Sequence, residues 1–67
     1  MKHDEYERLC AVFIKTFASV PDRLRDEIII VINNEPYTWR GAFIEIKAKT
    51  EKSKKIIEEL KNMKIIN

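Results

Sequence analysis

Hydrophobic positions in the first third of the chain recur at intervals of three and four residues. This spacing places them on one face of a helix. The members of the stripe are Tyr6, Leu9, Cys10, Phe13 and Phe17. The pattern predicts a helix from Asp4 to Ala18, with Asp4 as its N-terminal cap. Glu7, three residues later, is expected to reach back to the amide of the cap, as in a capping box.

The predicted helix has to end before Pro21. Proline has no amide hydrogen, and its ring clashes with the preceding turn of a helix. Ser19 is positioned to cap a short turn from Pro21 to Arg25.

The next segment, from Glu27 to Ile32, reads EIIIVI and predicts a strand, because β-branched side chains favour extended backbone. Asn33 and Asn34 follow it and predict a turn, since asparagine tolerates the left-handed region. Both alternating faces of the strand are apolar, which indicates cover on both sides. In so short a chain, we expect the second cover to come from another copy.

A short arm can pair back onto this strand after the turn. Tyr37 and Thr38 are expected to form it, with Pro36 restricted to an edge position because it cannot donate to a ladder.

The stretch from Trp39 to Lys49 fits two patterns. Its apolar residues Trp39, Ala42, Phe43 and Ile46 follow a helical stripe, whereas residues 44–49 alternate like a strand. We favour the helix, because Thr38 can serve as its N-cap. The strand would instead lengthen the hairpin and give the order α-β-β-α.

Thr50 can cap a last helix, from Glu51 to Met63. The apolar face of this helix consists of Ser53, Ile56, Ile57, Leu60 and Met63. The tail from Lys64 to Asn67 is either frayed or docked. The prediction is therefore a small single α+β domain, residues 1–67, with the order α-β-β-α-α.

A chain of 67 residues buries a small core and needs further stabilisation. Its one cysteine, Cys10, cannot form an internal disulfide, and with the one histidine, His3, it cannot complete a zinc site. With 45% hydrophobic residues, much of them isoleucine, the sequence favours a homodimer. The candidate interface residues are Ile28, Ile30, Ile32, Tyr37 and Trp39.

The charge pattern at the N-terminus does not resemble a signal peptide, and the longest apolar run, Ile28 to Ile32, is far too short to span a membrane. A lone cysteine suits a reducing compartment. We expect a soluble cytoplasmic protein. Its abundance of Lys, Glu and Ile is typical of thermophile proteins.

No catalytic, cofactor-binding or metal-binding set can be assembled from these residues. The chain has a single glycine, Gly41, and no phosphate-binding, nucleophile-elbow or zinc-protease motif. His3 and Cys10 lie seven residues apart, about 10 Å along a helix. Cys10 is expected to be buried, and the carboxylates have basic neighbours that neutralise them. We therefore predict no enzyme, no cofactor and no small-molecule substrate.

Basic residues gather around Thr50. The cluster consists of Lys47, Lys49, Lys52, Lys54 and Lys55. The chain carries a net charge of +4 from Arg40 onwards and −2 before it, which together give +2. Lysines at a helix start can hold phosphates or nucleic acid. Arginine, which binds phosphate in bidentate fashion better than lysine, is missing from the cluster. Nucleic-acid binding is therefore the alternative interpretation and not the favoured one.

The aromatic group of Tyr37, Trp39 and Phe43 admits two interpretations, an exposed platform for bases or a partner, and an anchor for the core. We favour the core anchor.

A strand followed by two helices joined at Thr50 resembles the ribbon-helix-helix family of DNA-binding proteins. In that family the ribbon sends polar side chains into the major groove, whereas Ile28 to Ile32 offers no polar side chain. No base-contacting residue is carried over. The function that the sequence favours is a small non-enzymatic protein-interaction module that is homo-oligomeric.

Overall fold

The computed structural model describes residues 2–66, which form three α-helices and one hairpin. The elements are α1 (His3–Ser19), a 3-10 turn η1 (Asp22–Leu24), β1 (Ile28–Ile32), β2 (Glu35–Thr38), α2 (Trp39–Ala48) and α3 (Glu51–Asn62). This order confirms the predicted α-β-β-α-α arrangement. The segment that follows the hairpin is helical, so the alternative with a longer hairpin is wrong.

Helix α1 buries the five predicted stripe residues, but it begins differently from the prediction. Lys2 occupies the N-cap position and makes no side-chain capping bond, while Asp4 lies in the first turn. Glu7 forms an ion pair with Lys49 and does not close a capping box. A full positive charge just after α2 is a stronger partner for this carboxylate than an amide of its own helix.

The end of α1 is closed by Arg25. Its guanidinium donates to the carbonyls of Val20 (3.1 Å) and Phe17 (3.2 Å) and lies 4.3 Å from the centre of the Phe17 ring. A cation here satisfies carbonyls that the helix end leaves free. Ser19 belongs to α1, and η1 follows Pro21 without a side-chain cap, so the predicted Ser19 cap is wrong.

The hairpin turns at Asn33 and Asn34, whose φ angles are 52° and 67°. Two successive left-handed residues are typical of the tight turn that joins two twisted strands, which confirms the turn prediction. Val31 pairs with Pro36, and Ile30 pairs with Tyr37. The register shifts between Ile28 and Ile30, so one extra residue of β1 bulges out of the ladder.

Both later helices have the N-caps that the sequence predicts. The Thr38 hydroxyl accepts from the Gly41 amide, and the Thr50 hydroxyl accepts from the Ser53 amide. Each bond satisfies an amide that the first helical turn leaves free. Met63, predicted on the buried face of α3, is its C-cap and is exposed, because the helix ends at Asn62.

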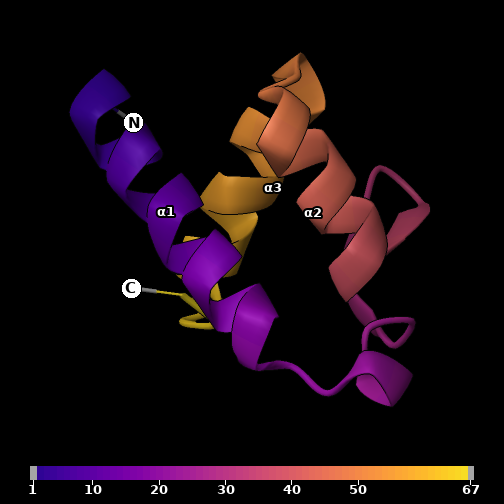
Figure 1. Cartoon of the computed structure of the whole chain (residues 1–67). Helices are drawn as coiled ribbons and strands as arrows, with labels where there is room; N and C mark the ends of the chain where they lie inside the picture. The colour runs from indigo at the N-terminus through magenta and orange to yellow at the C-terminus, as the bar shows by residue number, and fades with distance from the viewer. Residues whose placement is uncertain (1, 67) are drawn as a thin grey trace.

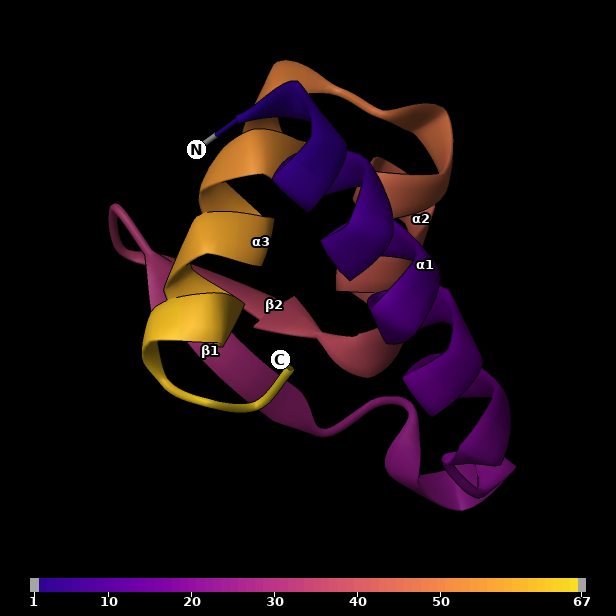
Figure 2. The same cartoon turned by 90° about the vertical axis from the view of Figure 1, so that its left-hand side faces the viewer.

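The three helices pack against one another and the hairpin closes the core. Figure 1 shows α3 between and behind α1 and α2, and Figure 2 shows the hairpin crossing below them with β1 as its lower strand. Aromatic rings of α1 and α2 meet in the core, with the Phe17 and Phe43 centroids 4.3 Å apart and those of Phe13 and Trp39 5.7 Å apart.

The tail after α3 is docked, which decides an alternative that the sequence left open. Lys64 has a φ of 60°, the Ile65 amide donates to the Leu60 carbonyl, and Ile66 is buried. The chain turns back at Lys64 and places the two isoleucines against the core. Asn67 lies outside the described residues.

Candidate functional site

The outer side of the hairpin presents apolar side chains that no other part of the chain covers. Ile28 and Val31 are each 60% exposed, whereas Ile30, between them, is buried. In regular alternation Ile28 would share the buried face of Ile30. The bulge at Ile28–Ile30 reverses the parity, so that Ile29 packs against the core and Ile28 faces outward.

Most of the predicted interface residues are therefore part of the core of one chain. Ile30 and Tyr37 are buried, while Ile32 and Trp39 are partly buried against the same core. Ile28 is the member of that group that faces outward. Tyr37, Trp39 and Phe43 anchor the core and do not form an open platform, as the aromatic contacts show.

Val31 joins Ile28 on the outer surface, and the sequence did not single it out. Its partner in the ladder is Pro36, which is also exposed, and directly opposed residues share a face of a sheet. The signal was available in the sequence as strand alternation around Ile30. The bulge that moves Ile28 to the same side has no sequence signal that we recognise.

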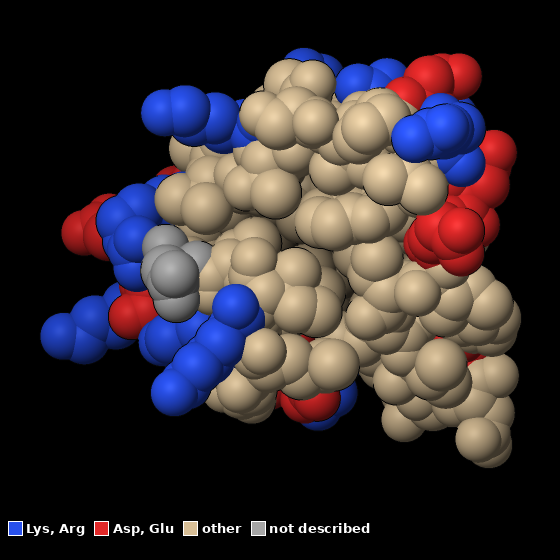
Figure 3. Space-filling model, turned by 90° about the horizontal axis from the view of Figure 1, so that it is seen from below, with Lys and Arg blue, Asp and Glu red and all other residues tan. Residues whose placement is uncertain are grey.

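The side of the molecule seen from below carries few charges at its centre. Figure 3 views the molecule from below and shows a broad area without Lys, Arg, Asp or Glu, with charged side chains gathered at its edges. Leu24 in η1 and Met63 at the end of α3 are also exposed apolar side chains. An uncharged area with a charged rim is typical of protein contact sites.

Four of the five clustered lysines have carboxylate partners. Lys49 pairs with Glu7, and the remaining pairs are Lys52 with Glu35 (3.4 Å), Lys54 with Glu51 (3.4 Å), and Lys55 with Glu58 (3.9 Å) and Glu59 (4.0 Å). Lys47 makes no ion pair with any residue in the range 2–66. The cluster is thus a surface of alternating charge and not a continuous basic patch.

Two of these pairs, Lys49 with Glu7 and Lys52 with Glu35, connect separate elements. A hydrogen bond from Lys49 keeps the pKa of Glu7 below the ordinary carboxyl value. The pKa of Glu35 is also lowered, first by a hydrogen bond from the Tyr37 hydroxyl and second by one from Lys52. Binding a phosphate would require these lysines to leave their carboxylates. The geometry therefore gives little support to a nucleic-acid site here.

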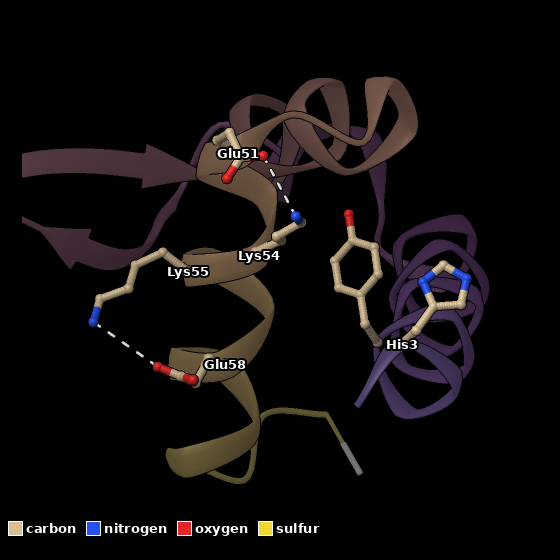
Figure 4. Close-up of a pocket in the computed structure, with 6 residues that line it drawn as sticks. His3, Glu51, Lys54, Lys55 and Glu58 are labelled. Atoms are coloured by element: carbon tan, nitrogen blue, oxygen red, sulfur yellow. Dashed lines mark hydrogen bonds and ion pairs between the residues drawn. The ribbon is translucent and has the colours of Figure 1, made fainter. Parts of the chain in front are cut away.

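A cleft lies between the start of α1 and α3. His3 and Tyr6 line one side, and Glu51, Lys54, Lys55 and Glu58 line the other. Figure 4 shows Glu51 joined to Lys54 and Lys55 joined to Glu58, both pairs on α3, with His3 on the opposite side. The carboxylates and amines neutralise one another along α3 itself. The cleft assembles no nucleophile with an oriented base.

Cys10 is buried in the core, as expected. Burial raises the pKa of its thiol, and the Tyr6 hydroxyl beside it opposes that rise only in part. A thiol with a raised pKa is a weak nucleophile at neutral pH. His3 lies at the exposed start of α1, away from this thiol.

Two classes of site have no counterpart in the part of the chain that the structure describes. Residues 2–66 contain no group of three or more His, Cys, Asp or Glu side chains arranged to hold a metal ion. None of the helices they form is long and apolar enough to cross a membrane.

The fold defines a small α+β domain in which a hairpin with an uncovered outer side packs on three helices. Neither the family models, nor the curated proteins, nor the solved structures compared with this chain include a match.

Proposed function

We propose that this protein is a small non-enzymatic protein-interaction module that acts as a homodimer, with the outer side of the hairpin as its contact surface. The observation that carries the proposal is the uncovered apolar pair Ile28 and Val31 on a five-residue strand. Removing such side chains from water is favourable by about 25 cal/mol per Å².

The proposed contact would cover a large share of the surface of so small a molecule. A standard interface removes about 800 Å² from each partner. That is about a sixth of the 4568 Å² that this chain exposes. A domain with so small a core gains much of its stability from a contact of this kind.

The test is sedimentation analysis of the wild type and two variants. We expect a dimer at micromolar concentration, and Val31→Asp should weaken it about a hundred-fold or more, because the contact would bury an unpaired carboxylate. Ile44→Asp is the matched control, since Ile44 is 59% exposed on α2 and lies outside the hairpin. It should leave the dimer intact.

Two results would contradict the proposal. One is a monodisperse wild-type monomer at micromolar concentration. The other is an equal loss of association in both variants, which would place the contact elsewhere.

A further inference from the structure

Strand β1 has one edge without a backbone partner. The sheet contains two strands, and no backbone hydrogen bond other than those to β2 reaches Ile28–Ile32 from any residue described. In a hairpin with a two-residue turn, the pair beside the turn exchanges both hydrogen bonds. Here that pair is Ile32 and Glu35. The next pair, Val31 and Pro36, therefore directs its backbone groups outward, and the Val31 amide and carbonyl lie on the open edge.

The two edges of the hairpin are protected differently. On β2, Pro36 has no amide to offer, Glu35 adds a charge, and α2 packs against the strand. Proline and charge are the usual means of preventing a strand from pairing with another chain. Strand β1 has neither, because all five of its residues are apolar and β-branched.

The open edge is also accessible. Figure 2 shows β1 as the lower strand of the hairpin, and Val31 on this strand is 60% exposed. From below, the molecule shows a broad area without charged residues (Figure 3).

Charges of opposite sign lie at the two ends of β1. Glu27 precedes the strand and makes no ion pair within residues 2–66. At the other end, Lys55 and Glu59 lie beside Ile32 and Asn33. The ion pairs of Lys55 with Glu58 and Glu59 are long, 3.9 and 4.0 Å, so its ammonium group is only weakly engaged. If an identical strand ran antiparallel to β1, Glu27 of each copy would approach Lys55 of the other.

We infer that β1 pairs antiparallel with β1 of a second copy about a two-fold axis, so that two hairpins form one four-stranded sheet. This inference rests on the homodimer proposed above and adds the strand edge as its mode of contact. A second copy fits this edge because the contact is self-complementary. Two uncharged strands meet without repulsion, and Glu27 of each copy attracts Lys55 of the other.

Hydrogen exchange provides a test that requires no substitution. The Val31 amide faces solvent in a monomer and is hydrogen-bonded in the paired sheet. We expect its protection, measured by NMR, to rise with protein concentration in step with dimer formation, at least ten-fold above the monomer value. Helical amides of α2 serve as the internal control. A Val31 amide that exchanges at the monomer rate in a fully dimeric sample would overturn the inference while leaving the homodimer itself standing.

A pair of substitutions at the same position separates edge pairing from packing of side chains. Val31→Pro removes the outward amide and retains an apolar ring, whereas Val31→Thr keeps the amide and the branched shape but adds a hydroxyl. Edge pairing predicts that proline weakens the dimer at least a hundred-fold and threonine less than ten-fold. Packing through side chains alone predicts the opposite order, which would refute the edge contact. Circular dichroism of each variant reports whether the fold is retained.

The end charges give a third test that does not touch the strand. Glu27→Lys and Lys55→Glu should each raise the dissociation constant about three- to ten-fold, and the double variant should restore it. Glu51→Lys is the control, because Glu51 begins α3 and lines the cleft with His3, not the hairpin end. Additive losses in the double variant would exclude the antiparallel arrangement.

Discussion

At the scale of single residues, Ser53 is the buried polar side chain among the residues described. Its hydroxyl lies 2.5 Å from the Thr50 carbonyl and 2.6 Å from the Tyr6 hydroxyl. Since a carbonyl only accepts, Ser53 donates to Thr50, and Tyr6 donates to Ser53. The sequence places Ser53 on the apolar face of α3, but nothing in it identifies Tyr6, on another helix, as the partner.

This arrangement predicts unequal effects of two substitutions. Ser53→Ala should lower the free energy of unfolding by about 1–3 kcal/mol, because it leaves the buried Tyr6 hydroxyl without this acceptor. Tyr6→Phe should cost less, about 0.5–1.5 kcal/mol, since Ser53 keeps its bond to Thr50. Urea denaturation of the two single variants and the double variant measures the coupling. If Ser53→Ala costs as much in the Tyr6→Phe background as in the wild type, the two hydroxyls are not coupled.

At the scale of elements, the ends of α2 and α3 share one feature. Lys49 and Lys64 follow the helices with φ angles of 54° and 60°, in the left-handed region that glycine favours. The next amide in each case bonds back to the last turn, from Thr50 to Glu45 and from Ile65 to Leu60. These are Schellman endings that have lysine where glycine is usual.

Glycine at position 64 should therefore stabilise the protein. Lys64→Gly relieves the left-handed strain of a residue with a side chain, and we expect a gain of about 0.5–1 kcal/mol. The same substitution inside α2, Lys47→Gly, should cost about 1 kcal/mol, because glycine is unfavourable in a helix interior. Thermal unfolding of both variants checks the opposite signs. A loss of stability in Lys64→Gly would contradict the proposed strain.

The sequence determines the elements better than their ends. The helical faces, Pro21 as a stop, the turn at Asn33–Asn34 and the two threonine caps all depend on residues within a few positions of one another, and the structure confirms them. The start of α1 does not depend on nearby residues alone, because the carboxylate of Glu7 has a better partner, Lys49, on a distant segment.

At the scale of the whole molecule, two ion pairs connect the first helix to later parts of the chain. Glu5 pairs with Lys61 on α3, and Glu7 pairs with Lys49 after α2. Hydrogen bonding to the lysines lowers the pKa of both carboxyls from the ordinary value of 4.5. They are surface pairs, so each contributes little on its own.

The lowered pKa values fix the sign of a pH effect. A carboxyl whose pKa is lower in the folded state stabilises the fold above its ordinary pKa, and this stabilisation is lost as the pH falls through the folded pKa. The melting temperature should therefore decrease below pH 4.5. A Glu5→Gln/Glu7→Gln variant should show a shallower decrease than the wild type in thermal unfolding between pH 7 and 2. Glu51→Gln, which alters a pair within α3, is the control and should keep the wild-type slope.

The sequence by itself determined the α+β class, the order of elements, the buried helix faces and the absence of a recognisable catalytic motif. These follow from local spacing and from residue chemistry. The tertiary structure decided which side chains of β1 remain at the surface, which lysines have carboxylate partners and that the tail is docked. Each of these depends on contacts between segments far apart in the chain, and a single extra residue in the ladder reverses which face is buried. The outer surface of the hairpin is therefore defined by Ile28 and Val31, and not by the alternation that the strand sequence suggests.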